Sequence, residues 1–317
     1  MASYLDFEKP VAELEAKLAE LRTLAERDGA VSIADEVARL ETKATEALTG
    51  LYAGLTPWQK TLVARHPQRP HFVDYCAALI QDFQPLAGDR GFGEDEAIVG
   101  GLGRFRDQPV LVMGQEKGAT TEARLRHNFG MARPEGYRKA ARLMAMADRF
   151  GLAVLSFVDT AGAFPGIEAE ERGQAEAIAR STEACLALGA PSVALVIGEG
   201  GSGGAIALAT ANRVLMMEHA IYGVISPEGA ASILWRDSAR AQDAATAMKI
   251  TAQDLLGLGV IDAIVPEPRG GAHRDPPAAI AAAGDAIAGA LAEMAGLAPD
   301  AVRDQRARKF LEIGRKL

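Results

Sequence analysis

The residues best suited to chemistry lie in one glycine-rich segment. Residues 198–204 contain five glycines in seven positions, after the apolar run 193–197 and before the apolar segment 205–211. Glycine permits positive φ angles and lets a ligand approach the main chain closely. The first N–H groups of a helix also lack internal partners and lie in a positive local field. The segment is therefore predicted to present backbone N–H groups to a negative atom, such as an oxyanion formed during a reaction.

A second loop has the same character. Residues 159–166 read D-T-A-G-A-F-P-G, follow the apolar run 153–158 and precede a helical pattern at 168–188. Ligands of α/β proteins bind in crevices at the ends of strands. Two strand–loop–helix junctions of this type therefore predict one shared crevice.

The same glycines match two nucleotide-binding motifs only in part. Residues 198–203 fit G-x-G-x-x-G, and Glu218 lies at about the spacing expected for a ribose contact. A parallel crossover needs ~12 residues or more, and the apolar helix here has only about eight before Asn212. We therefore disfavour a hydride-transfer enzyme. No Lys-Ser or Lys-Thr pair closes the loop, which argues against a P-loop.

A serine hydrolase is the alternative enzyme class. Residues 200–204 fit G-x-S-x-G with Ser202 as the nucleophile, and Asp262 and His273 follow in the required chain order. No residue that would orient His273 is apparent, so Ser202 is expected to form loop hydrogen bonds instead. Glu199 is expected to fix the turn and not to abstract a proton.

These loops need an α/β scaffold. Short apolar runs of strand length occur at residues 97–99, 110–113, 153–158, 193–197, 214–217 and 221–225. Helical patterns at 137–150 and 168–188 lie between them, the second with residues 175, 178, 182, 185 and 186 on its predicted apolar face. This alternation indicates α/β organisation. The runs at 110, 153 and 193 lie about 40 residues apart, which suggests a repeated strand–strand–helix unit.

Helices are predicted at both ends of the chain. Apolar residues at three- and four-residue steps predict two antiparallel helices, interrupted at Asp28-Gly29. Thr56 and Pro57 then begin a helix that reaches about residue 64. Residues 278–295 and 299–317 are expected to be helical. The last segment is basic, and its charges form either a solvated face or a surface for an acidic partner. They are Arg303, Arg306, Arg308, Lys309, Arg315 and Lys316.

Composition excludes several classes of protein. The 317 residues carry a net charge of -8, which argues against nucleic acid as the main partner. No apolar stretch approaches the ~20 residues of a membrane span, and the N-terminus does not resemble a signal peptide. The two cysteines, Cys76 and Cys185, offer no zinc spacing and no disulfide framework. We expect buried cysteines, no metal site in this chain and a cytoplasmic location.

Seven segments in a fixed order carry a resemblance to a known family. They are RHPQRP at 65–70, FGMARPEGYRK at 129–139, DTAGAFPG at 159–166, EERGQ at 170–174, GEGGSGGA at 198–205, VISPEG at 224–229 and PEPRGGAH at 266–273. In their order and spacing they resemble the carboxyltransferase α subunits of bacterial acetyl-CoA carboxylases. The resemblance extends from Leu5 to about Asp275, with the C-terminal helices only loosely matched. Ala161 departs from the family, which usually has proline there.

The resemblance implies a fold and a reaction. The fold is α/β and crotonase-like (ClpP/crotonase), a superhelix of ββα units. Residues 1–55 would be an N-terminal helical extension, and residues 56–317 the crotonase-like domain with its C-terminal helices. The reaction moves a carboxyl group from carboxybiotin on a carrier protein to acetyl-CoA, forming malonyl-CoA for fatty acid biosynthesis.

The resemblance also implies site residues. Gly203 and Gly204 would supply backbone N–H groups to the biotin ureido carbonyl. Substrate would contact Gly162, Gly166, Gly200, Gly201 and Arg138. Arg138 belongs to a basic stretch that could equally be surface charge.

Partners and cofactors follow from the same resemblance. The α chain would work with a β subunit as α2β2, together with the biotin carboxyl carrier protein and biotin carboxylase in an ATP-binding complex. Biotin would be on the carrier, the CoA thioester would be the substrate, and zinc would be confined to β. The resemblance implies no membrane or nucleic-acid partner.

Overall fold

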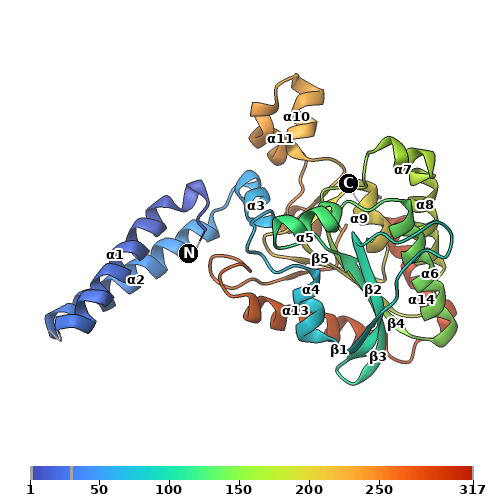
Figure 1. Cartoon of the computed structure of the whole chain (residues 1–317), viewed down its shortest axis with the longest axis horizontal. Helices are drawn as coiled ribbons and strands as arrows, with labels where there is room; N and C mark the ends of the chain where they lie inside the picture. The colour runs from blue at the N-terminus through green and yellow to red at the C-terminus, as the bar shows by residue number, and fades with distance from the viewer. Residues whose placement is uncertain (1–2, 29–30, 316–317) are drawn as a thin grey trace.

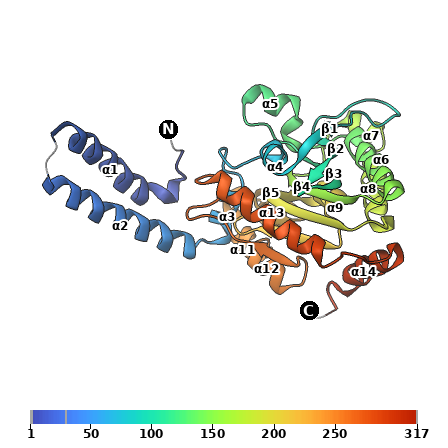
Figure 2. The ribbon, with the colours of Figure 1, turned by 90° about the horizontal axis from the view of Figure 1, so that it is seen from below.

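A helical hairpin begins the chain. The computed structural model describes residues 3–28 and 31–315. After η1 (Asp6–Glu8), helices α1 (Lys9–Asp28) and α2 (Val31–Ala53) run antiparallel and project from the rest of the molecule (Figures 1 and 2). The prediction of two antiparallel helices is confirmed, although Gly29 of the predicted break lies outside the described residues. The division of the chain into an N-terminal extension of residues 1–55 and a domain of residues 56–317 stays a prediction.

The strands form one mixed sheet. They are β1 (Gln81–Pro85), β2 (Ile98–Phe105), β3 (Gln108–Gln115), β4 (Ala153–Thr160), β5 (Ser192–Gly201), β6 (Arg213–Met217), β7 (Ile221–Gly223) and β8 (Ala263–Val265). The order is β1-β2-β3-β4-β5-β6-β8, and β7 pairs with the end of β5. β1, β2 and β3 pair antiparallel, whereas the pairs from β3 onward are parallel.

The register supports the spacing of the predicted repeat. Val110 pairs with Ala153, and Val154 pairs with Ser192, so β3, β4 and β5 start level with one another. The runs spaced about 40 residues apart are therefore equivalent strands of successive units. Their carboxyl ends lie together at one edge of the sheet.

Helices cover both faces of the sheet. They are α3 (Pro57–Ala64), α4 (Phe72–Leu79), α5 (Thr121–Arg126), η2 (Asn128–Gly130), α6 (Pro134–Phe150), α7 (Ile167–Glu171), α8 (Gln174–Ala187), α9 (Ser202–Ala209), α10 (Pro227–Trp235), η3 (Ser238–Arg240), α11 (Ala241–Ala247), α12 (Ala252–Gly257), α13 (Pro276–Ala292) and α14 (Pro299–Glu312). α6, α8 and α9 pack on one face, and α4 and α13 pack on the other (Figure 1). α10 and α11 form a separate projection.

Two helix predictions were wrong in detail. The pattern at 168–188 forms two helices because Gly173, with φ of 81°, ends the first and caps the second. Four residues of α8 are buried, and among those predicted for its apolar face only Cys185 belongs to them. The buried residues are Gln174, Ala177, Ser181 and Cys185.

A parallel crossover does follow β5, contrary to the prediction from the length of the helix. β5 and β6 are parallel neighbours although α9 has only eight residues. The pairing begins at Val193, near the start of β5, so the chain must return along almost the whole strand. An eight-residue helix spans about 12 Å, and residues 210–212 connect its end to the start of β6. Helix length alone therefore does not exclude a parallel crossover.

The basic C-terminal helix is anchored in the core. Arg306 is fully buried and donates hydrogen bonds to the carbonyls of Leu188 (2.6 Å) and Ala190 (3.2 Å) and to Ser192 Oγ (3.2 Å). The prediction of a wholly solvent-facing or docking surface is therefore wrong at this position. Arg308 is exposed, and Lys316 lies outside the described residues.

The cysteines and the helices can be compared with what the composition predicts. Cys76 and Cys185 are both free and buried, as predicted. Within residues 3–28 and 31–315, no helix is both long enough and apolar enough to cross a bilayer.

Candidate active site

The two glycine-rich loops meet at the edge of the sheet. Thr160, the last residue of β4, pairs with Gly200 near the end of β5. A Cβ atom at Gly201 would lie only 2.2 Å from the carbonyl oxygen of Ala161, so glycine is required for this approach. The two loops that were predicted to share a crevice therefore contact each other directly through their backbones.

The start of α9 carries free backbone donors. Ser202 has a φ of 49°, an uncommon conformation for a residue with a side chain, and turns the chain sharply from β5 into α9. Among the residues that the structure describes, no acceptor contacts the N–H of Gly203 or Gly204. Gly203 is half-buried and Gly204 is buried, so Gly203 is the more accessible of the pair.

The other predicted glycines are engaged differently. The N–H of Gly162 donates to Thr160 Oγ1 (3.1 Å), and Thr160 Oγ1 donates to the carbonyl of Gly162 (2.8 Å). Gly200 and Gly201 are buried in β5, where they pair with β7. Gly166 is half-buried and caps α7. Substrate binding by these four glycines stays a prediction, while the backbone donors without an acceptor among the described residues lie at Gly203 and Gly204.

Arg138 lies in a separate polar cluster. Its Nε donates to Asp89 (2.8 Å), its Nη2 to Glu135 (3.0 Å) and its Nη1 to the carbonyl of Arg172 (3.0 Å). Asp89 in turn accepts from three backbone N–H groups of its own loop. All three guanidinium nitrogens are therefore occupied within the chain, and these contacts lend no support to substrate binding by Arg138.

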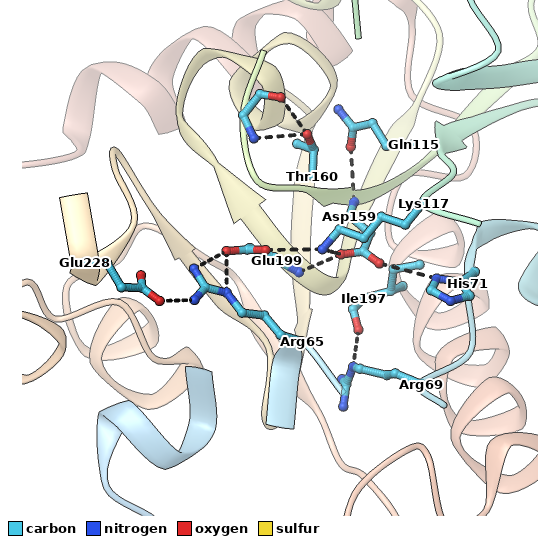
Figure 3. A network of polar contacts seen from close by, with 11 residues as sticks. Arg65, Arg69, His71, Gln115, Lys117, Asp159, Thr160, Ile197, Glu199 and Glu228 are labelled. Carbon is cyan, nitrogen blue, oxygen red and sulfur yellow. Dashed lines mark hydrogen bonds and ion pairs between the residues drawn. The ribbon is translucent and has the colours of Figure 1, made fainter. Parts of the chain in front are cut away.

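A partly buried charge cluster lies beside the glycine loops, and the sequence did not predict it as a unit (Figure 3). Lys117 Nζ lies 2.7 Å from Asp159 Oδ1 and 3.2 Å from Glu199 Oε2. Arg65 Nη2 lies 2.6 Å from Glu199 Oε1, and its Nη1 lies 2.6 Å from Glu228. The charges therefore alternate from Asp159 on β4 to Glu228 on α10.

The cluster fixes the ends of the two strands. Asp159 Oδ1 accepts a hydrogen bond of 2.9 Å from the backbone N–H of Glu199, which joins β4 to β5. Burial alone would raise the pKa of Asp159, but Lys117, His71 and the backbone N–H of Glu199 together outweigh burial and lower that pKa to about 2. Asp159 therefore stays ionised at neutral pH and acts as a fixed acceptor. The contacts of Glu199 agree with its predicted role in fixing the turn.

A pocket opens next to this cluster. It has a volume of about 290 Å³ and is lined by residues that include Arg65, Lys117, Asp159, Ala161 and Glu199. Ala161 belongs to the first glycine loop and Glu199 to the second, so both loops contribute to the lining of the pocket, whereas none of the described residues that line it belongs to α9. The sequence signals this pocket only through the polar residues that come after the apolar runs 153–158 and 193–197.

The geometry contradicts the serine-hydrolase alternative. Asp262 accepts from the backbone N–H of Val214 (2.6 Å) and from Lys309. His273 stacks on His66 with ring centroids 3.8 Å apart, and burial together with His66 lowers its pKa to about 3. Neither residue contacts Ser202, so no triad is assembled.

The dinucleotide alternative loses its ribose contact as well. Glu218 Oε2 accepts from the backbone N–H of Glu267 at 3.1 Å and serves the turn after β6.

Solved structures define the class of this fold. A transcarboxylase 12S structure with methylmalonyl-CoA and methylmalonic acid bound matches 69% of this chain and 40% of its own chain, with a TM-score of 0.57 and 19% identity. A Pseudomonas malonate decarboxylase hetero-tetramer in complex with coenzyme A matches 69% of this chain and 89% of its own, with a TM-score of 0.55 and 18% identity. The crotonase-like fold, known from carboxyltransferases, is confirmed.

Sequence comparison identifies the family within that class. The family model described as acetyl co-enzyme A carboxylase carboxyltransferase-like matches residues 4–314. The acetyl-coenzyme A carboxylase carboxyl transferase subunit alpha of Methylobacterium nodulans is 81% identical over 100% of both chains. The protein of that name from Xanthobacter autotrophicus is 75% identical, also over 100% of both chains. This chain belongs to the acetyl co-enzyme A carboxylase carboxyltransferase-like family.

The match has two consequences for the predictions. It extends to residue 314, so the expectation that the C-terminal helices match only loosely was wrong. Neither the family description nor the names of these relatives mention a nucleotide, so ATP binding by this chain has no support.

Proposed function

We propose that this chain is the α half of a cytoplasmic acetyl-CoA carboxylase carboxyltransferase. It transfers the carboxyl group of carboxybiotin, held on the biotin carboxyl carrier protein, to acetyl-CoA and so forms malonyl-CoA for fatty acid biosynthesis. Its partner is a β subunit in an α2β2 assembly, and biotin carboxylase charges the carrier. The observation that carries the proposal is the pair of free N–H groups at Gly203 and Gly204.

The chemistry needs donors of this kind. When carboxybiotin gives up its carboxyl group, negative charge develops on the ureido oxygen. Two N–H groups held by the end of β5 and by α9 stabilise that charge without reorganisation, and losing one such donor typically costs ~3 kcal/mol. The positive end of α9 acts in the same direction. The family and the crotonase-like fold support this assignment.

No side-chain base on this chain is required by the scheme. The ureido enolate that remains once carboxybiotin has released CO2 accepts a proton from the methyl group of acetyl-CoA, and the thioester enolate formed in this way attacks the CO2 to give malonyl-CoA. Asp159 and Glu199 are committed to Lys117 and Arg65, which makes them positioning groups. The thioester enolate is held by the β subunit, which also holds the family's zinc.

The reverse reaction tests the proposal. Malonyl-CoA decarboxylation is measured in the presence of biocytin, a free biotin analogue, with this chain alone and with its cognate β subunit. Activity confined to the mixture is the expected result. A verified, folded complex without biocytin-dependent activity would contradict the proposal.

A further inference from the structure

One buried glutamine joins the two glycine loops. Gln115, at the end of β3, is fully buried. Its Nε2 donates to the carbonyl of Gly204 at 2.7 Å, and its Oε1 accepts from the backbone N–H of Asp159 at 3.1 Å (the latter bond in Figure 3). The two partners fix the orientation of the amide, since a backbone carbonyl needs a donor and a backbone N–H needs an acceptor.

These contacts reach both ends of the crevice. Gly204 lies in the first turn of α9, where the free N–H groups are. A rigid peptide plane held at its carbonyl fixes the direction of the turn to which it belongs. Asp159, at the other end, holds the backbone N–H of Glu199 through its carboxylate. Gln115 therefore links the end of β4 to the start of α9 by a route that bypasses the glycine-rich residues 200–203.

We infer that Gln115 is a positioning residue for the oxyanion-binding amides of α9. This inference rests on the proposed role of Gly203 and Gly204. Gln115 does not itself touch the reacting atoms. It keeps the first turn of α9 at a fixed distance and angle from the loop 160–166. A donor displaced by about 1 Å can cost a reaction about 100-fold in rate.

The side chain at this position must donate and accept at once. A leucine leaves the N–H of Asp159 without an acceptor in a buried site. An ionised carboxylate satisfies that N–H but repels the carbonyl of Gly204, whereas a protonated carboxyl group satisfies both. Titratable groups near this position along the chain, or beside its two partners, are Glu116 and Lys117 on its own segment, Asp159 and Glu199 near the carboxyl ends of β4 and β5, and Tyr137 on α6 beside Gly204.

The chemistry of Gln115→Glu gives the test. In the αβ complex, kcat and KM for biocytin-dependent malonyl-CoA decarboxylation are measured between pH 6 and pH 9. Burial and the neighbouring carboxylates favour the protonated form of the introduced group at the lower pH. We expect kcat about 10- to 100-fold below wild type at pH 8 and recovery toward wild type as the pH falls. KM for malonyl-CoA should change less than about threefold, because this substrate binds the β half.

Control variants separate positioning from folding. Gln305→Glu makes the same change at a half-buried glutamine near the other end of β5, where the side chain of Gln305 accepts a hydrogen bond from Asn212 (2.9 Å). Its pH profile should parallel wild type. Gln115→Leu should stay slow at every pH, which shows that recovery requires a donor. If Gln115→Leu fails to assemble with β, the pH profile of Gln115→Glu decides alone.

The outcomes also separate this inference from the proposed function. An inactive wild-type complex, or a Gly204→Ala complex with full activity, removes the oxyanion role itself. A slow Gly204→Ala complex together with a Gln115→Glu profile parallel to wild type overturns only the role of Gln115. A Gln115→Glu variant changed only in KM also overturns it.

Discussion

Lys117 lies 2.7 Å from Asp159 and is the cation that makes two neighbouring carboxylates compatible in a buried site. Its other partner is Glu199, at 3.2 Å. Burial disfavours a charged lysine, but Asp159 and Glu199 outweigh this effect and raise the pKa of Lys117. Because Asp159 lies near the end of β4 and Glu199 lies in the second glycine loop, their ion pairs with Lys117 couple the charge balance of the site to its shape.

Lys117→Met should therefore destabilise the chain strongly. Removing one partner of a buried ion pair typically costs 3–5 kcal/mol, since it leaves an uncompensated charge. The free energy of unfolding in urea should fall by about that amount. The matched control is Lys249→Met, in an exposed pair with Asp254 at 3.9 Å, where a loss of about 0–1 kcal/mol is expected.

A second substitution tests the mechanism of this loss. Lys117→Met combined with Asp159→Asn removes one of the stranded charges, so the double variant should be more stable than the sum of the two single effects. Strict additivity would show that Lys117 acts through packing and not through charge.

The chain should lose stability in acid through Glu267. Burial raises the pKa of this carboxyl group, but Arg69, which binds both of its oxygens, lowers it to about 2. The unfolded pKa is ~4.3, so the stabilisation is present above pH ~4.3 and is lost as pH falls toward 2. It amounts to about 3 kcal/mol.

The measurement is the unfolding free energy between pH 6 and pH 2.5. Glu267→Gln starts from a lower value, because Arg69 loses its partner, but its stability should fall less steeply with pH than that of wild type. Asp285→Asn, an exposed aspartate, should keep the wild-type slope. Equal slopes for wild type and Glu267→Gln would contradict the prediction.

The parts of the fold that carry a local signal could be predicted from the sequence. β3 to β6 are continuous apolar runs, and α3 begins at Thr56, whose side chain accepts from the N–H of Gln59. In contrast, β1 is mostly exposed and has no apolar run, and β8 has only three residues. These strands owe their place to neighbours in the sheet and not to their own composition.

The candidate site was predictable only in its backbone. Glycines mark where the chain turns, so the two loops and the free donors of α9 could be placed. The charge cluster joins Arg65, Lys117, Asp159 and Glu199 from four separate segments, and Arg65 is 134 positions from its partner Glu199. Spacing along the chain does not reveal such pairs, because tertiary packing alone brings them together. Gln115 is hidden for the same reason.

Arg306 should contribute far more to stability than its neighbour Arg308. Arg306 is fully buried, has hydrogen bonds to three backbone carbonyls, and burial lowers its pKa to about 10. Arg306→Ala leaves these carbonyls without their donor and creates a cavity. The free energy of unfolding is therefore expected to fall by about 2–5 kcal/mol. Arg308→Ala should stay within about 0.5 kcal/mol. Thermal and urea unfolding of both variants check this, and equal effects would mean that α14 is held by other contacts.

Substitutions of the two adjacent glycines should separate loop contact from hydrogen-bond donation. A Cβ at Gly204 would lie 2.9 Å from the carbonyl carbon of Gly162 and 3.0 Å from the N of Ala163, so Gly204→Ala must push the two loops apart. A Cβ at Gly203 would contact only Ile178, at 3.4 Å, an ordinary packing distance. Both variants keep their N–H groups, and only the first displaces them.

We expect Gly204→Ala to lower kcat for biocytin-dependent decarboxylation by about 100-fold, and Gly203→Ala to lower it by less than about tenfold. Gly203→Ala should also be slightly more stable, because alanine is favoured over glycine in a helix by about 1 kcal/mol. Circular dichroism and assembly with β verify that each variant is folded. A Gly203→Ala variant as slow as Gly204→Ala would place the ligand on the side of α9 that faces α8, and would require a different orientation of biotin at these amides.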